Sequence, residues 1–302
     1  FRPHAAKIKR SGLQRAVLMA VQLPQLGFAL QPRRCCSARR SHGSFWLGCR
    51  WVMTLYRWAK ASRIGTSHIR LGTRKQDALK CFSMNSGLCA VVCDGAGSAE
   101  YGGEGASIIC RGFSSFVQDH FSKTDTMPTE DEIWFCIDDI RDRLSVAADK
   151  REVRRQNFAS TLVALVVTEA DIAVIHVGDG AIVGRTKDNK EWHALTWPEN
   201  GEYASTTYFL TDDPRPKVRI TYQSNEFDAF AVFSDGIEAL ALDYAANTAF
   251  APFFNKMIAP LDGLTVPGSD ANLSEALGGF LESERVCSRT DDDKSLILIS
   301  SV

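Results

Sequence analysis

Short apolar runs of strand length dominate the pattern of hydrophobic and polar positions. Five such runs cover residues 87–93, 158–168, 172–177, 227–233 and 295–302. Further strands are predicted at 64–71, 181–185 and 217–222, where apolar and polar residues alternate or a short apolar run follows a turn. The break at Glu169–Asp171 between two of the runs predicts a β-hairpin.

Helical spacing appears in fewer places. The strongest helix is predicted at 129–148, where Ile133, Ile137, Ile140 and Leu144 recur at helical intervals. Other helices are expected at 102–116, 236–245, 248–257 and 272–283. The polar, proline-bearing stretch 192–216 is expected to be mainly loop, with a strand near Tyr208.

The order of these elements indicates the fold class. Strands follow one another through hairpins and do not alternate with helices, so a doubly wound parallel sheet is disfavoured. We therefore expect an α+β fold, in which two mainly antiparallel sheets pack face to face with helices outside. One domain would hold this whole arrangement, since the sequence contains no internal repeat.

Charge separates the first fifty residues from the rest. Residues 1–52 contain ten Lys or Arg and no acid, whereas residues 53–302 contain 25 basic and 36 acidic residues, a net charge of −11. An acidic body argues against a nucleic-acid partner. The apolar run 16–30 is too short and interrupted for a membrane span.

Residues 1–52 resemble no folded unit. An Arg-rich, acid-free segment is also compatible with a transit peptide or a poor signal peptide. We expect instead a disordered basic segment derived from upstream or cloning sequence, followed by one domain over 53–302 that starts at Met53.

Cysteine usage indicates the compartment. The six cysteines after residue 52 show no Cys-x-x-Cys pair and no zinc spacing. We therefore expect free thiols in a reducing, cytoplasmic environment.

Aspartates stand at the ends of several predicted strands. Asp94, Asp179 and Asp235 each follow an apolar run and precede a glycine, and Asp291–Asp293 precedes the last run. One Asp-Gly pair is a common turn, but repetition favours a single cluster assembled from distant segments.

Oxygen ligands of this kind select magnesium, manganese or calcium. Two such ions held by shared carboxylates can activate water and clamp a phosphoryl group. No Gly-x-Ser-x-Gly, Walker or complete dinucleotide-binding motif competes with this interpretation.

Five motifs in order resemble the metal-dependent type 2C (PPM) Ser/Thr protein phosphatases, most closely their divergent bacterial branch. They are Gln76-Asp77, Asp94-Gly95-x-Gly97, Gly178-Asp179, Ser234-Asp235-Gly236 and Asp292-Asp293-x-Ser295. The resemblance spans residues 64–301 and implies a four-layer α-β-β-α sandwich with two Mn²⁺ or Mg²⁺ ions in a cleft at the strand ends.

The resemblance also implies roles for individual residues. Asp94 would bridge both ions and the Gly95 carbonyl would bind one of them. Asp235 and Asp292 would complete the other ion's ligands. Asp179 would match the acid of a third, weaker metal site. Asp77 would lie in the family's first acidic motif.

Two positions depart from the family pattern. Eukaryotic members carry a histidine where this chain has Ala96, and an arginine that grips phosphate where it has Gly72. Arg70 or Arg74 is expected to bind the phosphate instead, with His68 as a further alternative. A missing general acid predicts slower turnover of phosphoserine, since such catalysis contributes roughly 10²–10⁴-fold.

The leading hypothesis is a hydrolase that removes phosphate from Ser or Thr of a protein by a metal-activated water. The resemblance further implies a phosphorylated protein substrate, a cognate kinase, a monomer and a bacterial source. Two alternatives are a low-activity, phosphatase-like binding or regulatory module and a hydrolase of another phosphomonoester.

Overall fold

The computed structural model describes residues 56–199 and 207–302. The predictions for residues 1–52, and that part of the expected 192–216 loop between 200 and 206, lie outside the described residues. Among the described residues, no helix combines the length and hydropathy needed to cross a bilayer.

One sheet has five antiparallel strands in the order β2-β3-β4-β5-β8. Their bounds are Ala78–Met84, Gly87–Cys93, Leu162–Thr168, Asp171–Val177 and Arg219–Ser224. Tight hairpins join β2 to β3 and β4 to β5. The second of these is the hairpin that the break at Glu169–Asp171 predicted.

The other large sheet has six strands in the order β12-β1-β13-β9-β6-β7. Their bounds, in that order, are Gly268–Ser269, Tyr56–Arg63, Lys294–Ser301, Phe227–Phe233, Ala181–Thr186 and Trp192–Thr196. Only the β1–β12 pair is parallel. A small separate ribbon pairs β10 (Leu242–Asp243) with β11 (Thr248–Ala249).

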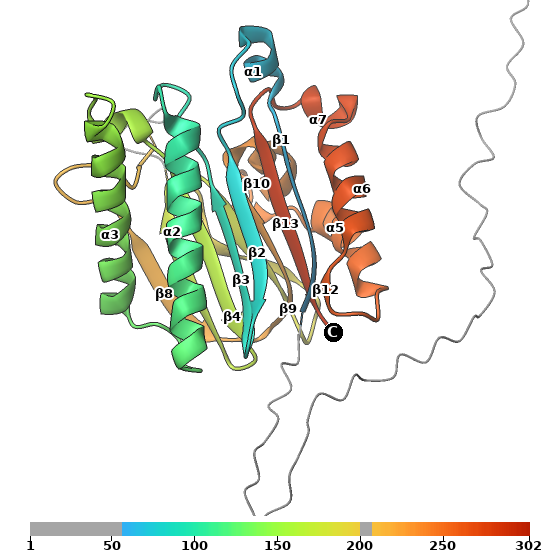
Figure 1. The fold of residues 1–302 in the computed structure, drawn as a ribbon. Coiled ribbons are helices and arrows are strands. Elements are labelled where there is room, and N and C mark those ends of the chain that lie inside the picture. Colours follow the sequence, from blue (N-terminus) through green and yellow to red (C-terminus); the bar gives the residue numbers. More distant parts are fainter. Residues whose placement is uncertain (1–55, 200–206) are drawn as a thin grey trace, which may run out of the picture. The chain divides into compact units, whose positions relative to one another are not determined.

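Two helix pairs cover the outer faces of the sheets. The longer helices, α2 (Gly102–Lys123) and α3 (Glu130–Asp149), lie over the five-stranded sheet, and α5 (Ala251–Asp262) and α6 (Ala271–Leu281) lie over the six-stranded one (Figure 1). Short helices α1 (Thr66–Leu71), α4 (Glu238–Ala241) and α7 (Glu284–Cys287), and the 3₁₀ turns Arg155–Phe158 and Asp235–Ile237, lie in the connections.

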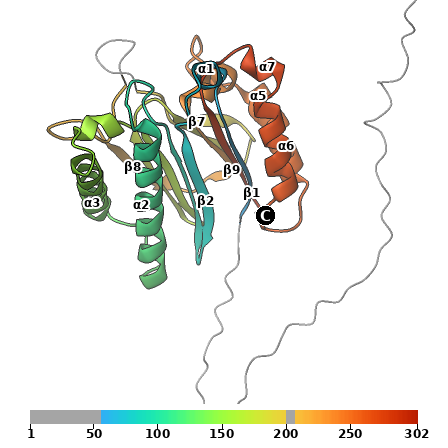
Figure 2. The ribbon, with the colours of Figure 1, turned by 45° about the horizontal axis from the view of Figure 1, so that its top comes forward.

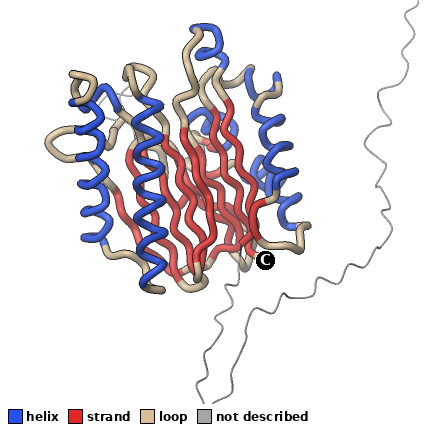
Figure 3. The backbone as a smooth tube through the Cα atoms, in the orientation of Figure 1, coloured by secondary structure: helices blue, strands red, loops and turns tan. Residues whose placement is uncertain are grey.

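Four layers result, with the two sheets packed between the helix pairs (Figures 2 and 3). Three apolar clusters fill the spaces between layers: one under α2 and α3, one under α5 and α6, and one between the sheets. The predicted α+β sandwich of two mainly antiparallel sheets is confirmed.

Burial on both faces explains the continuous apolar runs. In β3, Val91 and Cys93 pack toward α2 and α3, while Ala90 and Val92 pack toward the other sheet. Successive side chains of a strand point to opposite faces, so a strand in the middle of four layers needs apolar residues at every position.

Several element predictions were wrong. Residues 66–71 form helix α1 instead of a strand, and Ile69 and Leu71 are 60% and 77% exposed. Their alternation therefore does not mark a buried face. Strands β1, β2 and β7 fall where no strand was predicted, and the helix predicted at 236–245 is confined to the short α4, with β10 after it.

Candidate metal centre

Strand register gathers the acidic motifs at one edge of the two sheets. Ala78 pairs with Cys93, so Asp77 before β2 lies beside Asp94 after β3. Phe233 pairs with both Ala181 and Leu296, which brings the ends of β9, β6 and β13 together. Antiparallel neighbours place the end of one strand beside the start of the next.

A cavity of about 350 Å³ opens at this edge. Asp94, Asp179, Asp235 and Asp292 line it, together with Gly95. Carboxylate oxygens of the first three acids lie within 4.8 Å of one another. The structure therefore brings together five of the six residues predicted to bind metal.

Local hydrogen bonds fix Asp94 and Gly95. The backbone amide of Asp94 donates a hydrogen bond to Oγ1 of Thr161 at 2.9 Å. The backbone amide of Thr161 in turn donates one to the carbonyl oxygen of Asp94 at 2.8 Å. A Cβ on Gly95 would lie 2.3 Å from the backbone of Gly102 at the start of α2, so this position requires glycine. The stretch Ala159–Thr161 thus positions the Asp94-Gly95 motif.

Asp77 is the sixth predicted ligand, and it does not line the cavity. Its side chain is buried, accepts a hydrogen bond from Ser234 at 2.9 Å and lies beside Asp94. This placement suits a residue that orients Asp94 and Ser234 from behind the cavity wall.

The neighbouring acids Asp292 and Asp293 have different surroundings. Asp292 faces the cavity, with His68 Nε2 3.7 Å from its carboxylate. Asp293 is buried and accepts backbone amide protons from Gly65, at 2.7 Å, and from Gln76. It therefore ties the loop before β2 to the loop before β13.

Burial and mutual repulsion perturb these acids strongly. Burial, then the charges of Asp179 and Asp292, raise the pKa of Asp235 to about 8. Burial, then the charge of Asp77, raise the pKa of Asp94 well above its usual range. Desolvation is likewise the main cause of the raised pKa values of Asp77 and Asp179.

Two carboxylate oxygens show that the cluster fits a cation. Oδ1 of Asp235 and Oδ1 of Asp77 are buried without a hydrogen-bond partner among the described residues. Buried polar atoms are nearly always satisfied, and clustered carboxylates without a counter-charge repel one another. An all-oxygen donor set suits Mn²⁺ or Mg²⁺.

The candidate phosphate-binding residues differ in their surroundings. Arg70 forms an exposed ion pair with Asp291 at 2.8 Å. Arg74 lines a second cavity of about 880 Å³, whose wall shares Gly97 and Ser98 with the acidic cavity. The alternative His68 is bonded through Nδ1 to Thr73 at 2.9 Å.

Sequence reasoning missed three residues that support the centre. Thr207 donates a hydrogen bond to Asp179 at 2.5 Å. Glu238, on α4, has a pKa raised by burial and by the charge of Asp179, and it accepts a hydrogen bond from Tyr244. The Gly178-Asp179 and Ser234-Asp235-Gly236 motifs gave no signal for Thr207 and Tyr244, because these come from other segments. Glu238 follows Gly236 by two residues, but nothing in the sequence shows that it lies near Asp179.

Comparison with known proteins agrees with the geometry. The family model described as "Protein phosphatase 2C" matches residues 64–282. Serine/threonine-protein phosphatase 3 of Escherichia coli (strain K12) is 33% identical over 254 residues, covering 80% of this chain and 97% of the relative.

Solved structures share the fold. PppA, a regulatory component of T6SS in Pseudomonas aeruginosa, superposes with a TM-score of 0.57 at 16% identity, over 82% of this chain and 98% of that one. The catalytic domain of PstP, solved with two manganese ions, superposes with a TM-score of 0.54 at 13% identity, over 82% of this chain and 98% of that one.

The sandwich and its acidic cleft define a metal-dependent phosphoprotein phosphatase, a hydrolase. The chain belongs to the protein phosphatase 2C family. The predicted family is thereby confirmed, and the alternative of a low-activity, phosphatase-like binding or regulatory module is not favoured.

Proposed function

We propose that the chain removes phosphate from Ser or Thr of a protein substrate, with Asp94, Gly95, Asp235 and Asp292 holding two Mn²⁺ or Mg²⁺ ions. Asp179 contributes to the same cluster or to a third, weaker site. The observation that carries the proposal is the group of three carboxylates within 4.8 Å of one another at a cavity floor.

Two bound ions of this kind supply an activated water and positive charge for the phosphoryl oxygens. The chain's own residues hold this arrangement in place. Thr161 fixes the backbone of Asp94, Thr207 holds Asp179, and Asp77 supports the cluster from behind. Preorganised groups of this kind need little rearrangement during reaction.

Arg74 is the better candidate for binding the phosphate. Its cavity continues into the acidic one, and its guanidinium makes no ion pair with another described residue. Arg70 is already paired with Asp291. A planar guanidinium suits phosphate oxygens.

Ala96 lines the acidic cavity and cannot donate a proton. The leaving alkoxide of serine or threonine would then take its proton from solvent or from another group. This supports slow turnover of phosphoserine and phosphothreonine relative to p-nitrophenyl phosphate, whose leaving group is a weaker base.

The proposed setting follows from the same activity. The chain acts in the bacterial cytoplasm, as a monomeric domain over residues 53–302, on proteins phosphorylated by a cognate kinase. The six cysteines of the described residues are all free, which supports a reducing compartment.

The test is hydrolysis of p-nitrophenyl phosphate and of a phosphothreonine peptide with Mn²⁺, with Mg²⁺ and with EDTA. Asp94→Asn should reduce kcat at least about 100-fold if it removes a shared ligand. Turnover that survives both EDTA and this substitution would overturn the proposed function.

A further inference from the structure

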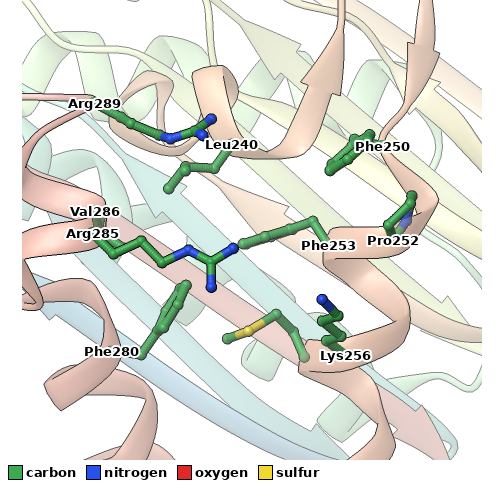
Figure 4. Close-up of a pocket in the computed structure, with 10 residues that line it drawn as sticks. Leu240, Phe250, Pro252, Phe253, Lys256, Phe280, Arg285, Val286 and Arg289 are labelled. Carbon is green, nitrogen blue, oxygen red and sulfur yellow. The ribbon is translucent and has the colours of Figure 1, made fainter.

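An apolar groove lies between helices α5 and α6, and none of its lining residues lines the acidic cavity. We define the α5–α6 groove by Phe253, Lys256, Met257, Phe280, Arg285 and Arg289. Two adjoining hollows of about 360 and 160 Å³ form it, and they share Lys256, Met257 and Phe280. Figure 4 shows the aromatic rings of Phe253 and Phe280 directed toward its centre.

Apolar side chains remain accessible in this groove. Phe250 at its end is 46% exposed, while Phe253, Met257 and Phe280 are partly buried. Accessible aromatic rings clustered in a hollow are typical of a surface that binds another protein.

Three cations line the groove, and Figure 4 shows the Arg285 side chain extending across it between Phe253 and Phe280. Lys256 comes from α5, Arg285 from α7 and Arg289 from the loop after α7, as Figure 4 shows. All three are exposed, and none makes an ion pair with another described residue. They stand out on a body whose net charge is −11 over residues 53–302.

Nearby acids are engaged elsewhere. Glu282 pairs with Arg63 at 3.2 Å, and Asp291 pairs with Arg70 at 2.8 Å. Of the acids between residues 282 and 291, only the exposed Glu284 has no ion pair with a described residue. The groove therefore presents a net positive rim around an apolar floor.

We propose that the α5–α6 groove docks an acidic segment of a protein partner that carries large apolar side chains, such as Phe and Leu. Acidic side chains of the segment would face Lys256, Arg285 and Arg289, while its apolar side chains fill the floor. Charge complementarity excludes the chain's own segment 1–52 as the occupant, because that segment is basic and contains no acid.

The position of the groove links docking to catalysis. Leu240 of α4 lines the groove, and the same short helix begins three residues after Asp235, which lines the acidic cavity. Asp292 follows Arg289 by three residues. That the partner is the phosphoprotein substrate rests on the proposed function, and a docked segment would hold its phosphorylated site near the acidic cavity.

Fluorescence anisotropy tests docking without catalysis. The full chain is titrated against a fluorescein-labelled, unphosphorylated peptide rich in Asp and Glu and containing Phe and Leu. Arg285→Glu/Arg289→Glu should weaken binding at least about tenfold, and added salt should weaken wild-type binding. The matched control is Lys150→Glu/Arg154→Glu, which reverses two exposed cations near α3 and should leave binding unchanged.

Other occupants give different results. Equal or tighter binding of a lysine-bearing peptide with the same apolar residues would overturn the proposal. So would a dimer of the chain, seen by sedimentation, that the Arg285→Glu/Arg289→Glu variant abolishes, because the groove would then bind a second copy.

Kinetics separate this proposal from the proposed function. A phosphothreonine peptide extended by the acidic segment should show a KM about tenfold higher with Arg285→Glu/Arg289→Glu than with wild type, at unchanged kcat. Hydrolysis of p-nitrophenyl phosphate should be unaffected. Absence of turnover on every substrate would contradict the proposed function alone, since the anisotropy result still decides whether the groove binds.

Discussion

At the scale of single residues, the acidic centre trades stability for the ability to bind cations. Burial and like charges raise the pKa values of Asp94, Asp179 and Asp235, so their ionised forms are unfavourable without a counter-charge. Groups perturbed in this way mark functional sites. These acids should therefore lower the stability of the metal-free protein and raise its stability when metal is bound.

Asp235→Asn should raise the Tm of the metal-free protein by about 2–4 °C, the shift that 1 kcal/mol gives in a domain of this size. It removes a carboxyl group that the folded, metal-free protein keeps only by holding a proton, because burial and the charges of Asp179 and Asp292 raise its pKa to about 8. The same variant should lose most of the Tm increase that Mn²⁺ gives to wild type. Asp188→Asn, at an exposed acid outside the cavity, is the control and should change neither value.

The free energy of unfolding of the metal-free protein should decrease as the pH rises from about 4 to about 8. Asp235 has a pKa of about 8 in the folded state and an ordinary value of 3.8, so in this interval the folded state retains a proton that the unfolded state has lost. Urea unfolding in EDTA at several pH values measures this. Mn²⁺ affinity should rise over the same interval, because ligation displaces that proton; a flat profile for both would contradict the assignment.

Arg74→Ala should raise KM for p-nitrophenyl phosphate about tenfold, the usual loss for a hydrogen bond between charged groups. Arg70→Ala should change KM less than about twofold, since Arg70 forms an exposed pair with Asp291. Steady-state kinetics with saturating Mn²⁺ measures both. The reverse order of effects would assign the phosphate to Arg70.

At the scale of elements, the start of α2 and the end of β3 must approach closely. Gly95 forms an isolated bridge with Ser160, and its Cα faces the backbone of Gly102 and Gly103. This contact holds the first metal-binding motif between a strand and a helix, and a side chain at Gly95 would separate them.

Gly95→Ala should therefore lower the free energy of unfolding by more than about 2 kcal/mol and weaken Mn²⁺ binding. Gly97→Ala is a matched control two residues away, because a Cβ there would meet nothing within 4 Å. Urea denaturation and calorimetric titration with Mn²⁺ give the two measurements. Equal effects at both glycines would show that the close approach to α2 does not matter.

At the scale of the whole molecule, the centre joins the two sheets. Asp94 follows a strand of the five-stranded sheet, whereas Asp235 and Asp292 flank strands of the six-stranded sheet. A cation bound by all three would be lost when the sheets separate, so binding should stabilise the domain as one unit.

Mn²⁺ at 100 times its Kd should add about 2.7 kcal/mol to the free energy of unfolding. Ile297→Ala, in the cluster between the sheets, should remove about 2–5 kcal/mol without changing that increment. Val266→Ala, at a side chain that is 72% exposed, should cost less than about 0.5 kcal/mol. A metal increment that disappears in Ile297→Ala would mean that the core substitution also distorts the centre.

The sequence by itself determined the strands that are buried on both faces and the acids at their ends. Continuous apolar runs of strand length, such as 87–93 and 227–233, are typical of strands that are buried on both faces. An Asp-Gly pair directly after such a run is expected at the edge of the sheet where the strand ends. The sandwich of two sheets could therefore be predicted, and the resemblance of the five ordered motifs to a known family indicated the family. Half-buried or edge elements could not: β1 carries charged Arg57 and Lys60, and the exposed Ile69 and Leu71 of α1 imitate strand alternation.

Only the tertiary structure decided how the acids divide their tasks. Asp292 and Asp293 are identical neighbours in sequence, yet one faces the cavity and the other is buried and accepts backbone amide protons from Gly65 and Gln76, which only the folded chain brings close. Strand register likewise placed Asp77 beside Asp94, and the folded chain brought Thr207, which lies outside the named strands, to Asp179. The cations of the α5–α6 groove have the same origin, since Lys256 lies far in sequence from Arg285 and Arg289 and meets them only where the helices pack.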